Sequence, residues 1–159
     1  MKNIEKPKLE KKESAEKPIT AVCVVIENME GKILLFKSLY QRTSGKTEAV
    51  GLPAGLVDTT DSGKSEDPEI AATRELLEET GLQTNGPLVL LYDGETPSGK
   101  RVVSYLCPKW QGEIKASEEG LVYWGEKEEL TGESGGYPDY NKKVLQALQS
   151  INSKNETYS

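Results

Sequence analysis

Three glutamates near the middle of the chain are spaced so that they could hold a metal ion together. Glu75, Glu78 and Glu79 stand at positions i, i+3 and i+4, and in an α-helix this spacing confines the three carboxylates to an arc of roughly 100°. Like charges at i,i+4 repel, and Glu78 and Glu79 would also meet the negative end of the helix dipole. A hard divalent cation would relieve both effects. The cluster indicates a metal site, with a solvated acidic helix face as the alternative.

The residues on either side of the glutamates predict where that helix begins and ends. Asp67 followed by Pro68 is typical of an N-cap and a first helical residue, and Gly81 is typical of the residue just past a helix. We therefore expect a helix of about three and a half turns between them. Arg74 stands four residues before Glu78 and supplies a local counter-charge.

The same segment resembles the Nudix box, whose pattern is G-x5-E-x7-R-E-U-x-E-E-x-G-U with U apolar. The run from Arg74 to Leu82 reads RELLEETGL, and seven residues separate Glu66 from Arg74. The glycine of the pattern would fall at Thr60, so Gly55 is the better candidate. Thr59 to Lys64 is then a loop with about five extra residues, a lengthening that costs well under 1 kcal/mol in a surface loop.

The resemblance implies a site for Mg²⁺, with Mn²⁺ as a substitute. Its ligands would come from the box and the preceding loop: Glu75, Glu78, Glu79 and the backbone at Gly55. Arg74 would orient the carboxylates, and Glu66 would support them from outside the set of direct ligands. Of the box residues, Glu78, Glu79 and Arg74 are expected to take part in catalysis.

A general base is expected on a late loop before a strand that carries a tryptophan. Glu118 and Glu119 precede Trp124 in this way, and the closeness of two carboxylates raises the pKa of one of them toward neutrality. Glu118 is favoured, while Glu119 or a box glutamate remains the alternative. Carboxylates that are merely solvated would explain the pair equally well.

The loop before the box carries the information on substrate. Leu52 to Asp58 reads LPAGLVD, which resembles the version common in ADP-ribose and sugar-nucleotide pyrophosphatases. Pro97, fifteen positions beyond Leu82, fits the same group. Arg42 and Lys46, in a polar loop, are candidate substrate contacts, with exposure to solvent as the alternative.

The resemblance therefore implies Mg²⁺-dependent hydrolysis of the diphosphate linkage in a nucleoside diphosphate joined to another group, such as ADP-ribose or a sugar nucleotide. A pyrophosphohydrolase of nucleoside triphosphates, modified triphosphates or dinucleotides is the alternative within the same chemistry. A Nudix-fold module that binds a nucleotide without cleaving it is the alternative of another class. Such modules typically lose box glutamates, which this chain keeps.

The composition sets limits on partners and chemistry. A net charge of −6 argues against binding to duplex nucleic acid or to an anionic membrane, so a small nucleotide is the expected partner. Histidine is absent, which leaves carboxylates as the acid-base groups. Cys23 and Cys107 stand in apolar stretches and are expected to be thiols. The start of the chain lacks an apolar signal segment, so a cytoplasmic protein is expected, either a monomer or a homodimer.

The chain is long enough for one domain. Residues 1–18 hold six lysines and four glutamates and are expected to be a disordered charged tail. The Nudix domain is expected over 19–152 and a flexible C-terminus over 153–159. Apolar runs predict a hairpin of Ile19 to Ile26 with Lys32 to Lys37, further strands on both sides of the central helix, and a last helix capped by Asp139. This order fits an α+β fold, a mixed β-sheet sandwiched between helices.

Overall fold

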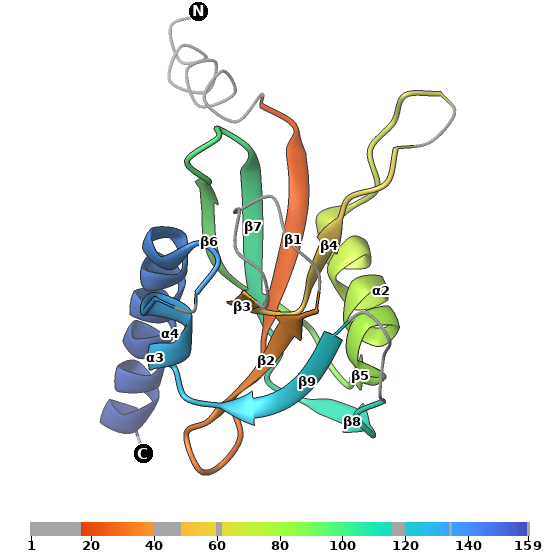
Figure 1. Ribbon diagram of the computed structural model, residues 1–159. Coiled ribbons are helices and arrows are strands. Elements are labelled where there is room, and N and C mark those ends of the chain that lie inside the picture. The colour runs from red at the N-terminus through yellow and green to blue at the C-terminus, as the bar shows by residue number, and fades with distance from the viewer. Residues whose placement is uncertain (1–16, 40–48, 60–61, 116–119, 134, 159) are drawn as a thin grey trace, which may run out of the picture.

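The computed structural model describes residues 17–39, 49–59, 62–115, 120–133 and 135–158. This part of the chain forms an α+β fold of nine strands and three helices (Figure 1). The strands are β1 (Ile19–Val25), β2 (Ile33–Ser38), β3 (Val50–Gly51), β4 (Ala54–Leu56), β5 (Leu82–Thr84), β6 (Val89–Glu95), β7 (Arg101–Leu106), β8 (Trp110–Gly112) and β9 (Gly120–Gly125). The helices are α2 (Pro68–Thr80), α3 (Glu128–Thr131) and α4 (Pro138–Tyr158).

The strands form one mixed sheet and two smaller antiparallel sheets. The largest sheet has the order β4-β1-β7-β6, in which β1 and β7 are parallel and the other pairs antiparallel. A second sheet has the order β3-β2-β9, and β5 pairs with β8. The predicted mixed sheet is therefore confirmed, with β4 as one of its edge strands.

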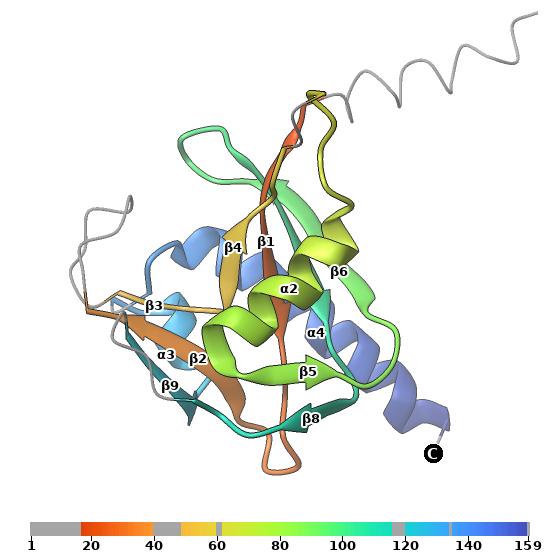
Figure 2. The same cartoon turned by 90° about the vertical axis from the view of Figure 1, so that its right-hand side faces the viewer.

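Helices cover both faces of the mixed sheet, as predicted. Figure 2 shows α2 in front of β4 and β1, with α4 on the far side. The side chains of β1 alternate between two buried clusters, because successive residues of a strand point to opposite faces. Val22 and Val24 pack on the α2 side, and Val25 packs on the α4 side.

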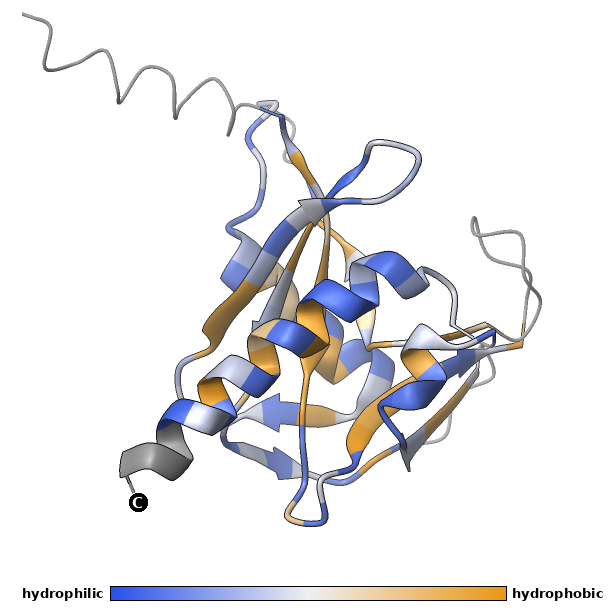
Figure 3. Cartoon of the chain, turned by 90° about the vertical axis from the view of Figure 1, so that its left-hand side faces the viewer, coloured by the Kyte–Doolittle hydropathy of each residue, from blue (hydrophilic) through white to orange (hydrophobic). Residues whose placement is uncertain are grey.

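Helix α4 lies against its face of the sheet by one apolar stripe. Tyr140, Val144 and Leu148 recur at helical spacing and are buried, and Figure 3 shows orange, hydrophobic segments alternating with blue, hydrophilic ones along the helix. The helix begins at Pro138, so Asp139 lies in its first turn and the prediction that it caps the helix is wrong. The helix also continues past residue 152 to Tyr158.

The predicted hairpin exists only at its base. A bridge joins Glu27 to Ile33, and the Leu34 amide donates to the Ile26 carbonyl at 2.9 Å. Beyond that point the two strands diverge into different sheets, because β1 pairs with β4 and β7 while β2 pairs with β3 and β9. Local turn residues specify the reversal of the chain. Pairing with distant strands determines the sheet to which each strand belongs.

Lys17 is the first described residue at the N-terminal end. Lys17 contacts the domain, since its ammonium lies 3.2 Å from the Glu95 carboxylate and donates to the Gly99 carbonyl at 2.7 Å. Residues 1–16 lie outside the described residues, so disorder of the tail stays a prediction. Both cysteines are free thiols as expected, with Cys107 buried and Cys23 half-buried. Among the described residues no helix has the length and apolar character that crossing a bilayer requires.

Candidate active site

The central helix α2 has the predicted ends. The Asp67 carboxylate accepts a hydrogen bond from the Glu69 amide at 2.8 Å, and Pro68 is the first helical residue. Gly81 adopts a left-handed conformation with φ of 87°, and its amide donates to the Leu77 carbonyl at 2.9 Å. Such a φ favours glycine because it lacks a Cβ. The inner face of the helix is apolar and buried: Ala71, Ala72 and Leu76.

Two of the predicted glutamates lie directly against the loop before the helix. A Cβ added to Gly55 would overlap the carboxyl group of Glu75, so the helix approaches β4 as closely as a glycine allows. The Glu79 carboxylate accepts a hydrogen bond from the Ala54 amide at 2.8 Å. The predicted loop glycine and the box glutamates are therefore neighbours in space.

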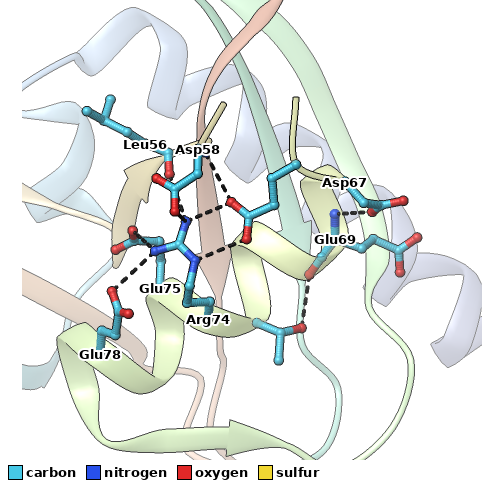
Figure 4. A network of polar contacts seen from close by, with 9 residues as sticks. Leu56, Asp58, Asp67, Glu69, Arg74, Glu75 and Glu78 are labelled. Carbon is cyan, nitrogen blue, oxygen red and sulfur yellow. Dashed lines mark hydrogen bonds and ion pairs between the residues drawn. The ribbon is translucent and has the colours of Figure 1, made fainter. Parts of the chain in front are cut away.

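Arg74 links the acidic residues of this region (Figure 4). Its guanidinium donates to both Glu66 oxygens at 2.8 and 3.1 Å, to Glu75 at 2.7 Å and to Glu78 at 3.3 Å. A further bond of 3.1 Å reaches the Leu56 carbonyl in β4. The fork geometry of arginine suits this role, because one planar group can bind several oxygens in fixed directions.

The extra loop leaves the position of Glu66 undisturbed. A bridge joins Thr59 to Ser65 across the base of the loop. The Glu66 amide donates to the Asp58 carbonyl at 2.8 Å, and the Asp58 amide donates to the Glu66 carboxylate at 3.1 Å. The chain thus returns to its starting point before it enters α2, so that Glu66 lies beside Asp58 despite the longer loop.

The two carboxyls that flank Arg74 respond in opposite ways to their surroundings. Hydrogen bonds from Arg74 and from the Asp58 amide lower the pKa of Glu66. Burial raises the pKa of Glu75, and the nearby charge of Glu78 acts in the same direction, while Arg74 opposes both. A further cation beside Glu75 would thus offset the hydration that burial removes from its carboxylate.

The side chains provide donors that suit a hard divalent cation. Within the described residues, no three acidic or cysteine side chains are close enough together to coordinate a metal ion in their present orientation. Glu75 and Glu78 face Arg74, and Glu79 faces the Ala54 amide. All three nevertheless offer carboxylate oxygen on one helix, and the Glu78 side chain is 58% exposed, with a bond of 3.3 Å to Arg74. The set fits such a cation in donor type and in position along one helix.

A cavity of about 470 Å³ lies on the other face of β4. It adjoins the side of the mixed sheet that α4 covers, since Ala21 and Val102 line it. Its volume falls in the range of small-molecule sites, roughly 300 to 1,000 Å³. Because β4 is an edge strand, a ligand that crosses its edge reaches both the cavity and the carboxylates of α2. The lining also includes Phe36, Leu52, Thr96, Lys100, Tyr137 and Asn141.

Most residues of this cavity were not predicted from the sequence. Asn141 is 6% exposed, and its side-chain amide donates to the Leu130 carbonyl at 3.0 Å. A polar residue in register with the buried stripe of Val144 and Leu148 was the signal that could have identified it. Pro97 is exposed and does not line the cavity, although its neighbours Thr96 and Lys100 do.

Four predicted site residues lie outside the described residues, namely Arg42, Lys46, Glu118 and Glu119. Their roles stay predictions. Among the described ones, the structure brings Glu66, Arg74, Glu75 and Glu78 into one network and sets Glu79 against β4.

Solved structures share this fold. The chain is similar to a MutT Nudix hydrolase from Burkholderia pseudomallei, with a TM-score of 0.63 and 24% identity over 82% of this chain and 98% of the other. It is similar to an Ap4A hydrolase from C. elegans, with a TM-score of 0.61 and 21% identity over 84% and 98%. A UDP-X diphosphatase gives a TM-score of 0.62 and 19% identity over 95% and 73%. No curated protein sequence matches the chain.

The family model of the NUDIX domain matches residues 17–148. This range contains the box, the loop before it and every strand of the three sheets. Members of the family generally use divalent metal ions and act on nucleotides. The chain therefore belongs to the Nudix family and is a pyrophosphohydrolase of that type.

Proposed function

We propose that the protein catalyses Mg²⁺-dependent hydrolysis of the diphosphate linkage in a nucleoside diphosphate joined to a second group, such as ADP-ribose or a sugar nucleotide. The observation that carries this proposal is the position of β4 between the carboxylates of α2 and the cavity. A diphosphate at the edge of β4 would lie beside the carboxylates while one of its organic groups occupied the cavity.

Each residue of the site has its own role in the proposed reaction. A bound Mg²⁺ ion would supply electrophilic activation of phosphorus and a lower pKa for the attacking water. Glu75, Glu78 and Glu79 would hold the ion, and Arg74 would keep the Glu75 carboxylate oriented through its bond of 2.7 Å. Glu66 would in turn fix Arg74 through its two hydrogen bonds.

The general base is proposed to be Glu118, with Glu119 or a box glutamate as the alternative. The support is the spacing of Glu118 to Trp124 in the sequence. Trp124 belongs to β9, which begins directly after the loop of these two glutamates. A base in this loop would remove a proton from the attacking water.

The substrate class rests on the loop before the box and on the cavity. The run from Leu52 to Asp58 supports a nucleoside diphosphate with a second organic group, and its residues Leu52 and Leu56 also line the cavity. The names of two solved relatives, a UDP-X diphosphatase and an Ap4A hydrolase, agree with this class and with the dinucleotide alternative respectively. Arg42 and Lys46 remain candidate contacts to the phosphates.

A substrate panel with Mg²⁺ tests the proposal. We expect kcat/KM for ADP-ribose or a sugar nucleotide to exceed that for every nucleoside triphosphate. The loss of one productive hydrogen bond to the sugar would cost about 1 to 3 kcal/mol, which lowers kcat/KM by roughly 5- to 150-fold. Dominant release of nucleoside monophosphate and pyrophosphate from a triphosphate would overturn the substrate class. Binding of nucleotides without any cleavage would instead favour the non-catalytic module.

A further inference from the structure

Three cations gather where the N-terminal end of the domain meets the β6–β7 hairpin, and two of them are paired. Arg101 forms a bidentate pair with Asp93, at 2.9 and 2.7 Å. Lys17 lies 3.2 Å from Glu95. In the described part of the chain the third cation, Lys100, has no carboxylate partner. The two acidic residues of the hairpin, Asp93 and Glu95, are thus paired with Arg101 and Lys17 and not with Lys100.

The backbone of Lys100 is fixed at the end of a tight turn. Its amide donates to the Thr96 hydroxyl at 3.3 Å, and its carbonyl accepts from the Thr96 amide at 2.9 Å. The Gly99 amide donates to the Thr96 carbonyl at 2.8 Å, and the Lys17 ammonium holds the Gly99 carbonyl. A turn held in this way fixes the backbone from which the Lys100 side chain extends, so binding need not order the backbone as well.

The side chain of Lys100 belongs to the cavity. Lys100 directly precedes β7, and Arg101, the residue between Lys100 and Val102, does not line the cavity. Both Lys100 and Val102 line the cavity, and Lys100 is the one charged residue among the described residues of the lining. An ammonium group without a counter-charge at an otherwise neutral cavity favours an anionic ligand group.

Lys100 lies too far from the box to serve the scissile diphosphate. Leu56, Ala21 and Val102 lie in register across β4, β1 and β7, so Leu56 and Val102 are separated by two strand spacings, about 10 Å. Lys100 stands two residues before Val102, which places its backbone roughly 12 Å from Leu56. The four-carbon stem of lysine does not span that distance.

We infer that Lys100 binds an anionic substituent, a phosphate or a carboxylate, on the organic group that occupies the cavity. This inference rests on the proposed function and adds to it a substrate class: nucleoside diphosphate compounds whose second group, or whose nucleoside, carries its own negative charge. The lysine contacts the substituent, while the carboxylates of α2 serve the diphosphate that all such substrates share.

Matched substrate pairs test this inference. UDP-glucuronate and UDP-glucose differ by a carboxylate, and ADP-ribose 2′-phosphate and ADP-ribose differ by a phosphate. Lys100→Met should lower kcat/KM for the charged member of a pair by about 5- to 30-fold, and should change the neutral member by less than about twofold. Lys100→Arg should restore the preference. The pair that responds identifies whether the group is a carboxylate or a phosphate.

The controls separate this inference from the proposed function. Lys109→Met removes an exposed lysine that does not line the cavity, and it should leave both members of each pair unchanged. Equal losses on charged and neutral members in Lys100→Met, or no change in either, would overturn the inference. If the wild-type protein cleaves none of the four compounds, the proposed function fails, and calorimetric affinities of the same pairs for wild type and Lys100→Met still decide the role of Lys100.

Discussion

Gly55 and Glu75 are so close that a single methyl group on Gly55 would occupy the space of the Glu75 carboxyl. The contact joins an edge strand to the helix that carries the candidate metal ligands, and it leaves no room for any other residue at position 55. It also buries Glu75, which raises the pKa of its carboxyl. One backbone position therefore determines the location of a candidate ligand and contributes to the burial that raises its pKa.

Gly55→Ala should displace Glu75 and lower kcat by about tenfold or more, since small misplacements at a reacting centre have effects of this size. Gly132→Ala is a suitable control, because an added Cβ there meets only the Glu128 carbonyl oxygen, at 3.2 Å, far along the chain from the site. Steady-state kinetics and thermal melts of both variants provide the measurement. Normal turnover in Gly55→Ala would show that the position of Glu75 is unimportant.

Glu78→Gln and Glu79→Gln should each reduce kcat by about 100-fold or more while the fold is kept. Each removes one negative charge from the candidate metal site without changing the size of the side chain. Glu69→Gln removes an equal charge from an exposed residue in the first turn of the same helix, and it should retain wild-type rates. If all three variants behave alike, the glutamates form a solvated face and no metal site.

The sequence was most informative where the signals are local. Asp67, Pro68 and Gly81 predicted both ends of α2 because capping depends on neighbouring residues alone. The family spacing likewise predicted Glu66 as an outer support of this region and Arg74 as the residue that orients the carboxylates, and the structure joins the two by two hydrogen bonds. Half of the candidate site, the carboxylate side, could thus be predicted from residue spacing.

The other half depends on pairings between distant strands. The parallel pairing of β1 with β7 brings Ala21 next to Val102, and α4 then closes the cavity with Asn141. No short pattern encodes such contacts, because a strand's partners are chosen by packing over the whole sheet. The strands β4 and β5, each of three residues, were missed for the same reason.

Glu66→Gln should destabilise the protein by about 1 to 2 kcal/mol at neutral pH, because it weakens the charged hydrogen bonds to Arg74. The pKa of Glu66 is lowered in the folded state from its usual value of 4.5. Its stabilisation is therefore complete above pH 4.5 and is lost as the pH falls through the lowered pKa. Chemical denaturation of both proteins between pH 3 and 7 measures this, and a difference that stays constant over the range would contradict it.

Two truncations should distinguish the contribution of the tail to stability from the contribution of the contacts that Lys17 makes. Removal of residues 1–16 should leave the melting temperature unchanged, as the composition of the tail predicts. Removal of residues 1–18 also takes away Lys17, whose ammonium contacts Glu95 and Gly99 and whose carbonyl accepts from Arg101 at 2.7 Å. The expected cost is about 1 kcal/mol, since the side chains are half exposed. Equal melting temperatures for the two truncations would show that these contacts contribute nothing.

Mg²⁺ should raise the melting temperature of the wild-type protein, because a ligand that binds only the folded state stabilises it. At 100 times its dissociation constant the ion would add about 2.7 kcal/mol, which corresponds to roughly 5 to 10 °C for a domain of this size. Glu75→Gln and Glu79→Gln should lose most of this shift, whereas Glu69→Gln should keep it. NaCl at equal ionic strength controls for general ionic effects on the acidic surface. The same shift in all variants would place the bound ions elsewhere and exclude Glu75 and Glu79 as metal ligands.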